Sequence, residues 1–235
     1  AYPLTAFIQA AGTGIGMGGA VMFAIHNGSG DDSRSRKFFG ISLLLLALSG
    51  FLFTLFFLGS GERILRMFGA EGDILRLGAE YFRYIAFGTL FQVMATGIVP
   101  FIRNMGSPVT AMFAMTGGFL TNILLDYILV WVLPYGMTGA AVATVIGQAV
   151  TLAVCLIFLM RKRELPSLSF DKETLLMAGK VLFVAISPFG LTFSPNITLI
   201  LVNKSAVYYG GNTAVACYAS ISYISSVVLL LLQGV

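Results

Sequence analysis

An asparagine and an aspartate stand four residues apart in one long apolar stretch of the sequence. The stretch runs from Pro108 to Trp131, long enough to span a bilayer, and carries Asn122 and Asp126. A charged side chain at the centre of a bilayer costs about 2.5–3.5 kcal/mol on insertion scales, so such residues usually have a function. Four residues make about one helical turn, which places the amide and the carboxylate on one helix face. We interpret the pair as half of a cation or proton site.

The next apolar stretch, 139–160, brings a third oxygen ligand to the same depth. It follows a connection of six residues, so the two predicted helices are antiparallel neighbours. Asp126 lies about 8 Å from the outer end of its helix and Thr144 about 8 Å from the start of the next, at 1.5 Å per residue. These oxygens suit Na⁺, whereas protonation of a partly buried carboxylate would serve H⁺ coupling. The alternative is that Asp126 only hydrogen-bonds to neighbouring helices.

Seven apolar stretches organise the whole chain. Of its 235 residues, 57% are hydrophobic and 10% are charged, against about 25% charged in an ordinary soluble domain. The mean hydropathy is +0.91. An all-α polytopic membrane protein is therefore predicted. Its spans, each near or above the ~20 residues that a bilayer needs, are approximately 2–25, 38–58, 74–101, 108–132, 139–160, 175–203 and 213–235.

The basic residues predict the orientation of these spans. Because spans alternate in direction, the first, third and fifth connections share one side of the membrane. Nine basic residues belong to or adjoin those connections, against five on the other side, so the first set is predicted to be cytoplasmic. The formal charge of +4 does not indicate nucleic-acid binding, since these residues form short clusters between apolar runs. The nine are Arg34, Arg36, Lys37, Arg103, Arg161, Lys162, Arg163, Lys172 and Lys180.

Small residues recur at helical spacing in the first predicted span. Gly12 and Gly16 are four residues apart, as are Gly14 and Gly18, and such spacings let two transmembrane backbones approach closely. Gly-x-Gly-x-Gly strings also occur in nucleotide-binding turns, but those require a preceding strand in a soluble βαβ unit. We therefore assign these glycines to helix packing.

Further polar side chains mark faces of other predicted spans. Thr89, Gln92 and Thr96 are three to four residues apart in the third span, so they share one helix face. Two interpretations stay open, namely hydrogen bonds between helices or one wall of a water-filled cavity. Gln148, one turn below Thr144, and Asn203 in the sixth span are further candidates to line a cavity.

Five phrases of the sequence, in their order and spacing, carry a family resemblance. They are YPLTAFIQAAGTGIGMGGA, IVPFIRNMGSPVTAM, NILLDYIL, GMTGAAVATVIGQ and ISPFG. Together they resemble the multidrug and toxic compound extrusion transporters, or MATE proteins, and especially prokaryotic branches with an Asn-x-x-x-Asp pair in the fifth helix. The resemblance implies a twelve-helix, two-lobe inverted-V transporter, of which this chain covers about helices two to eight. We therefore expect a fragment.

The resemblance also implies a domain division and a cation site. Residues 1–160 would form an N-terminal lobe without its first helix, 161–174 a cytoplasmic linker between lobes, and 175–235 the truncated start of a C-terminal lobe. In related members the cation site uses an aspartate of the first helix, the Asn and Asp of the fifth and a Thr of the sixth. Asn122, Asp126 and Thr144 match the last three, and the aspartate would precede Ala1. A branch with an acidic residue on the seventh helix is not matched, because the corresponding span has none.

The implied function is export by a cation-coupled antiporter. Na⁺ or H⁺ would drive the efflux of amphiphilic or cationic drugs and toxic compounds by alternating access. The implied location is the prokaryotic plasma membrane, which the chain would cross several times. Small molecules and membrane lipid are the expected partners, with no cofactor beyond the coupling ion. Neither nucleic acid nor an obligate protein partner is indicated.

Two alternative functions stay open beside export. A lipid-linked saccharide flippase of the same superfamily would need a basic cluster for pyrophosphate, and the first span has no intramembrane Arg or Lys. A seven-helix receptor-like membrane protein would also begin outside, but its Asp-Arg-Tyr and Asn-Pro-x-x-Tyr motifs are absent. An enzyme is not predicted, because the sequence offers no paired carboxylates, His clusters or activated nucleophile.

Overall fold

The computed structural model describes residues 2–67, 72–162, 166–167 and 172–233. Apart from short connections, these residues are helical, and none of the described ranges contains a strand. Among them, six helices are long and apolar enough to cross a membrane, which confirms the predicted all-α polytopic fold class. Their bounds are α1 Tyr2–Gly28, α2 Asp32–Met67, α3 Gly72–Asn104, α4 Pro108–Asp126, α5 Gly136–Lys162 and α6 Lys172–Gln233, with a short π-helix, η1, at Tyr127–Val132.

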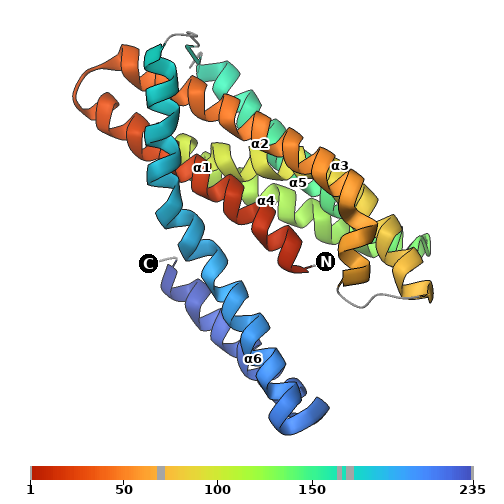
Figure 1. The fold of residues 1–235 in the computed structure, drawn as a ribbon. Coiled ribbons are helices and arrows are strands. Elements are labelled where there is room, and N and C mark those ends of the chain that lie inside the picture. The colour runs from red at the N-terminus through yellow and green to blue at the C-terminus, as the bar shows by residue number, and fades with distance from the viewer. Residues whose placement is uncertain (1, 68–71, 163–165, 168–171, 234–235) are drawn as a thin grey trace. The chain divides into compact units, whose positions relative to one another are not determined.

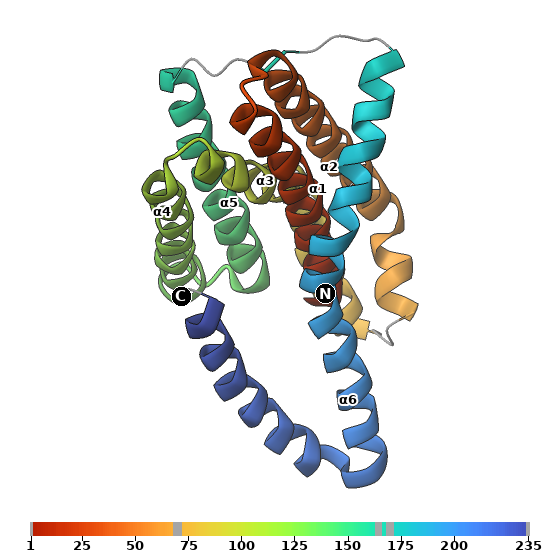
Figure 2. The same ribbon diagram turned by 90° about the vertical axis from the view of Figure 1, so that its left-hand side faces the viewer.

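The last helix, α6, is two helices joined at a kink. Gly211 has φ 59° and ψ −158°, a conformation that glycine adopts readily because it has no Cβ. The chain turns back at this point (Figure 2). The seventh predicted span, 213–235, corresponds to the helical segment after Gly211, where most side chains lie outside the described residues.

The chain divides into two compact units, 1–192 and 193–235. In the first unit, α3 is central and contacts α1, α2, α4 and α5 (Figure 1). The beginning of α6 also belongs to this unit, since Val181 packs with Phe38 of α2. Lys37 Nζ donates to Glu173 Oε2 at 3.3 Å beside that contact. The predicted lobe boundaries at 160 and 175 stay a prediction.

Aromatic side chains fill the core of the first unit near its predicted cytoplasmic end. The ring of Phe101 on α3 lies 5.9 Å from that of Phe23 and 5.0 Å from that of Phe39, centroid to centroid. All three side chains are buried. Because lipid tails are as apolar as these rings, the hydrophobic effect does not favour such contacts between helices in a bilayer. Close packing and van der Waals attraction favour them instead.

The four glycines of α1 lie at two different helix contacts. Gly12 and Gly16 face α3, where Thr96 and the backbone of Gly97 leave no room for a Cβ. Gly14 and Gly18 face α6, where the backbone around Ala185 occupies the corresponding space. The two four-residue spacings of the sequence therefore belong to two helix pairs.

The connections with the basic clusters lie together at one end of the first unit. Asn104 Nδ2, at the end of α3, donates to the carbonyl oxygen of Ala20 on α1 at 2.8 Å. Lys162, at the end of α5, donates to the carbonyl oxygen of Met105 in the connection between α3 and α4. These bonds join neighbouring helices and connections at the end of the unit that we predict to be cytoplasmic. Arg163, which belongs to the same predicted set, lies outside the described residues.

Candidate functional site

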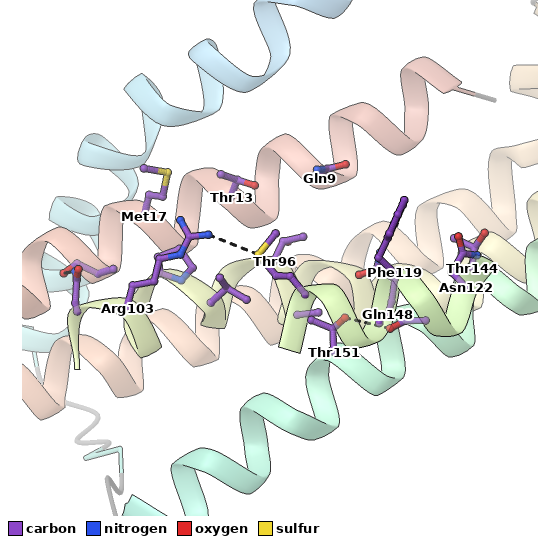
Figure 3. Close-up of a pocket in the computed structure, with 18 of the residues that line it drawn as sticks. Gln9, Thr13, Met17, Thr96, Arg103, Phe119, Asn122, Thr144, Gln148 and Thr151 are labelled. Atoms are coloured by element: carbon purple, nitrogen blue, oxygen red, sulfur yellow. Dashed lines mark hydrogen bonds between the residues drawn. The ribbon is translucent and has the colours of Figure 1, made fainter. Parts of the chain in front are cut away.

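A cavity of about 610 Å³ lies among α1, α3, α4 and α5. Its size is within the range of about 300–1,000 Å³ that is typical of small-molecule sites. Figure 3 shows side chains from these four helices converging on it. The neutral polar side chains around it are those of Gln9, Thr13, Thr96, Asn104, Asn122, Thr144, Gln148 and Thr151.

Apolar side chains form much of the cavity wall between these polar groups. Met17 comes from α1, while Met115 and Phe119 come from α4. Phe119 is 64% exposed in this unit, so its ring is available to a ligand. Methionine is flexible and polarisable, and it adapts to ligands of different shapes. The wall therefore suits amphiphilic molecules with a sizeable apolar body.

Three of the four threonine hydroxyls of the cavity are committed as donors to their own helices. Thr96 Oγ1 donates to the carbonyl oxygen of Gln92 at 2.8 Å, and Thr144 Oγ1 to that of Ala140 at 2.9 Å. Thr151 Oγ1 makes the equivalent bond, visible in Figure 3, to its own helix at 3.1 Å. A hydroxyl that has donated its proton offers only lone pairs to a ligand. These side chains therefore act as acceptors toward the cavity.

Close packing of α4 on α5 brings Asn122 to the cavity. A Cβ placed on Gly147 would lie 2.9 Å from the Cβ of Asn122, so the asparagine fits only because α5 has a glycine there. Figure 3 shows Asn122 and Thr144 among the side chains that line the cavity. The pairing of these helices that the short connection predicts is therefore present, and both residues line the cavity.

Asp126 lies one turn beyond Asn122 and is not part of the cavity lining. In the described structure, its Oδ1 and the Nδ2 of Asn122 are buried and have no hydrogen-bond partner. An unsatisfied buried polar atom costs about 1–3 kcal/mol. A cation bound at Oδ1 would remove this cost for the carboxylate. Rotation of the Asn122 amide would present its carbonyl oxygen to the same cation, since the two ends of an amide have similar shape. The residues present therefore fit a cation.

A π-helix follows Asp126 directly. In η1 the backbone N–H of Leu133 donates to the carbonyl oxygen of Ile128, five residues earlier, at 2.9 Å. π-helical turns are rare and occur often at functional sites. The apolar stretch 108–132 predicts an uninterrupted helix here. Pro134 and Gly136 indicate where the helix ends, but they do not indicate this change of hydrogen bonding.

One residue of α3, Glu80, contacts the start of α5. Glu80 Oε1 accepts a hydrogen bond from Thr138 Oγ1 of α5 at 2.8 Å. The sequence does not predict this contact between Glu80 and Thr138, because it depends on how α3 crosses the α4–α5 pair. Among the described residues, no three His, Cys, Asp or Glu side chains come together as they would in a transition-metal site.

The remaining predicted residues are placed as follows. Gln148 and Thr96 line the cavity, whereas the side chain of Gln92 does not. Thr89 is fully buried and donates to its own helix. The side chain of Asn203 lies outside the described residues.

Arg103 lines the cavity at the end of α3, although the sequence analysis counts it only among the basic residues of a connection. Its sequence signal is weak, because Arg103 lies two residues past the predicted span 74–101. Pro100, three residues before it, also lines the cavity.

Six membrane-length helices in the described residues define a polytopic helical membrane protein, and a ligand-sized cavity with mixed polar and apolar walls lies among its helices. A model of the MatE family matches residues 1–128, more than half of the chain. The chain therefore belongs to the MatE family, and the family resemblance of the sequence is confirmed.

Relatives and solved structures of this family cover nearly the whole chain. The chain is 26% identical over 221 residues to the multidrug export protein MepA of Staphylococcus saprophyticus, covering 92% of this chain and 48% of the relative. It is 28% identical over 245 residues to the probable multidrug resistance protein YoeA of Bacillus subtilis, covering 97% and 51%. An outward-facing structure of a multidrug resistance MATE family transporter of the MOP superfamily matches with a TM-score of 0.88 and 27% identity, over 99% of this chain and 52% of that one. The chain spans about half the length of the curated relatives it matches.

Proposed function

We propose that the protein containing this chain exports amphiphilic drug-like compounds across the membrane, in exchange for Na⁺ or H⁺ that binds at Asp126. The names of MepA and YoeA support export of several drugs, and the cavity supports binding of amphiphiles. The observation that carries the coupling is the buried Oδ1 of Asp126, which has no partner in the described structure and lies one turn from a residue that lines the cavity.

Asn122 could couple the binding of substrate in the cavity to the binding of a cation at Asp126. It borders the cavity and stands four residues before Asp126, on the same helix face. A substrate in the cavity and a cation at Asp126 would both engage its amide, so occupancy of one site disfavours the other. Thr144 would supply a hydroxyl oxygen to the cation from α5. The cation can drive alternating access only as far as it binds the two conformations with different affinity.

Replacement of Asp126 by asparagine tests the coupling. In the full-length protein, we expect Asp126→Asn to abolish ethidium efflux driven by an imposed Na⁺ or pH gradient. The neutral amide has no negative charge to attract Na⁺, and it cannot take up and release H⁺. Membrane insertion and purified yield should stay at the wild-type level. A matched control is Glu62→Gln, which neutralises an exposed carboxylate paired with Arg66 at 2.8 Å. Gradient-driven efflux at the wild-type rate in Asp126→Asn would disprove the assignment.

The flippase alternative finds less support in the cavity. A site for pyrophosphate would need several basic side chains to match its charge. In the described part of the chain, the cavity lining includes one basic residue, Arg103. Membership of the MatE family also rules out the seven-helix receptor-like alternative.

A further inference from the structure

A guanidinium group stands at the predicted cytoplasmic end of the cavity with almost no partner. Arg103 donates to the thioether sulfur of Met115 at 3.6 Å, and in the described residues no carboxylate lies within salt-bridge distance of it. A thioether is a weak acceptor, whereas a guanidinium offers five N–H donors. Figure 3 shows this side chain reaching from α3 toward the cavity. Most of its donors are therefore available to a ligand.

Other basic residues at this end of the unit differ from Arg103. Arg34 and Lys37 both pair with Glu173, at 3.8 and 3.3 Å. Lys162 donates to a backbone carbonyl oxygen. None of these three lines the cavity. Maintaining the membrane orientation requires only a positive charge near the surface, so it does not explain why Arg103 points its donors into a binding cavity.

The charges around the cavity are arranged along α4. Within residues 108–162, which include α4 and α5, Asp126 is the single carboxylate. It lies eleven residues beyond Met115, the neighbour of Arg103, or about 16 Å along the helix at 1.5 Å per residue. The cavity thus has a permanent positive charge at one end and a carboxylate past the other. A ligand oxyanion is attracted to the Arg103 end and repelled from the Asp126 end.

Three hydroxyls of the wall do not compete with Arg103 for an anion. The hydroxyls of Thr96, Thr144 and Thr151 have donated their protons to their own helices, so they cannot stabilise an anion. Arg103 is the one side chain of the described lining that supplies full positive charge, and its planar fork matches a carboxylate or phosphate in two parallel hydrogen bonds. Met17 and Met115 place apolar surface beside it.

We propose that Arg103 is an anion-recognition residue, which gives this cavity affinity for amphiphiles that carry a carboxylate or similar oxyanion next to an apolar body. The inference deepens the proposed export function, because it rests on the cavity being a substrate site, and it defines a class of substrate beyond simple cations. Zwitterionic amphiphiles are favoured most, since their cationic group is tolerated by the acceptor oxygens deeper in the cavity.

Rhodamine B and its methyl ester test the proposal, because they differ only in whether the carboxylate is free. The full-length protein is placed in phosphatidylcholine nanodiscs, with no ion gradient, and equilibrium binding is measured by fluorescence polarisation. We expect Arg103→Gln to weaken rhodamine B binding by about tenfold to a hundredfold, the usual range for a hydrogen bond to a charged group. Binding of the ester should change by less than about twofold.

Two further variants separate anion recognition from general effects. Arg103→Lys keeps the positive charge but lacks the two parallel N–H donors of the guanidinium group, so it should weaken rhodamine B binding less than Arg103→Gln does. Arg161→Gln removes a positive charge at the same end of the unit from a residue that does not line the cavity, and it should leave both dyes unchanged.

The results divide clearly between the two proposals. Equal weakening of both dyes in Arg103→Gln, or no change in either, would overturn the role of Arg103 while leaving the export function standing. If neither dye binds the wild type, the substrate cavity itself is wrong, and this inference fails with it. If added phosphatidylglycerol abolishes the preference for rhodamine B, the oxyanion comes from lipid and the substrate class is wrong.

Discussion

Two adjacent glycines of α4 provide a sharp test of how tightly α4 packs on α5. A Cβ on Gly118 would meet the hydroxyl of Thr151 and would lie 2.6 Å from the carbonyl oxygen of Gly147. A Cβ on Gly117 would have no atom within 4 Å. Alanine raises helix propensity by about 1 kcal/mol over glycine at either position. The difference between Gly118→Ala and Gly117→Ala therefore isolates the steric effect.

The steric cost at Gly118 follows from the atoms that must move. Backbone cannot shift as a flexible side chain can, so the two helices must separate, and overpacking of this kind costs about 1–3 kcal/mol. This corresponds to about a 5-fold to 150-fold change in the unfolding equilibrium of the full-length protein, measured by titration with sodium dodecyl sulfate in mixed micelles. Because Gly118, Gly147 and Thr151 line the cavity, dye binding should weaken in parallel.

A second substitution checks the cause of the loss. Gly118→Ala combined with Thr151→Ala removes the hydroxyl but leaves the carbonyl oxygen of Gly147 in place, so we expect part of the stability to return. Equal stability of Gly118→Ala and Gly117→Ala would refute the close packing of α4 on α5 described above. Full recovery in the double variant would show that the hydroxyl alone, rather than the backbone, sets the limit.

The core and the surface of the first unit should respond very differently to substitution. Phe101→Ala should lower the free energy of unfolding by about 3–5 kcal/mol, because its buried ring joins α3 to α1 and α2. Phe56→Ala, at a side chain that is 56% exposed, should have little effect in the same titration. Similar losses for both variants would contradict the assignment of the core. Glu173→Gln should change stability by less than about 1 kcal/mol, since Glu173 is 49% exposed and its ion pairs with Lys37 and Arg34 are screened by solvent. That effect should shrink further in high salt, so a large, salt-insensitive loss would show that these pairs are more deeply enclosed than the structure has them.

The helices and part of the cavity lining could be predicted because their signals are local. Apolar length defines the spans, and one helical turn relates Asn122 to Asp126. The short connection to α5 forces the next helix to return alongside, which brings Thr144 to the cavity that Asn122 also lines. These arguments use only spacing along one or two neighbouring helices, where helical geometry is fixed.

Contacts that depend on helix rotation and crossing could not be predicted in this way. Periodicity places Gln92 and Thr96 on one face of α3, yet only Thr96 lines the cavity, because the direction of that face depends on the packing around α3. The same is true of Arg103, whose sequence neighbours suggest only a basic connection. The division of the α1 glycines between α3 and α6 likewise depends on where two distant helices lie.

The π-helix η1 ends the ligand face of α4 by changing the helical phase. A π-turn contains about one more residue than an α-turn, and one residue of an α-helix corresponds to about 100° of rotation. Side chains toward the end of η1 therefore point up to about 100° away from where an unbroken α-helix would direct them. The row that includes Asn122 and Asp126 does not continue toward Trp131, which is 81% exposed. The outer limit of the site is thus set by backbone winding as well as by side-chain chemistry.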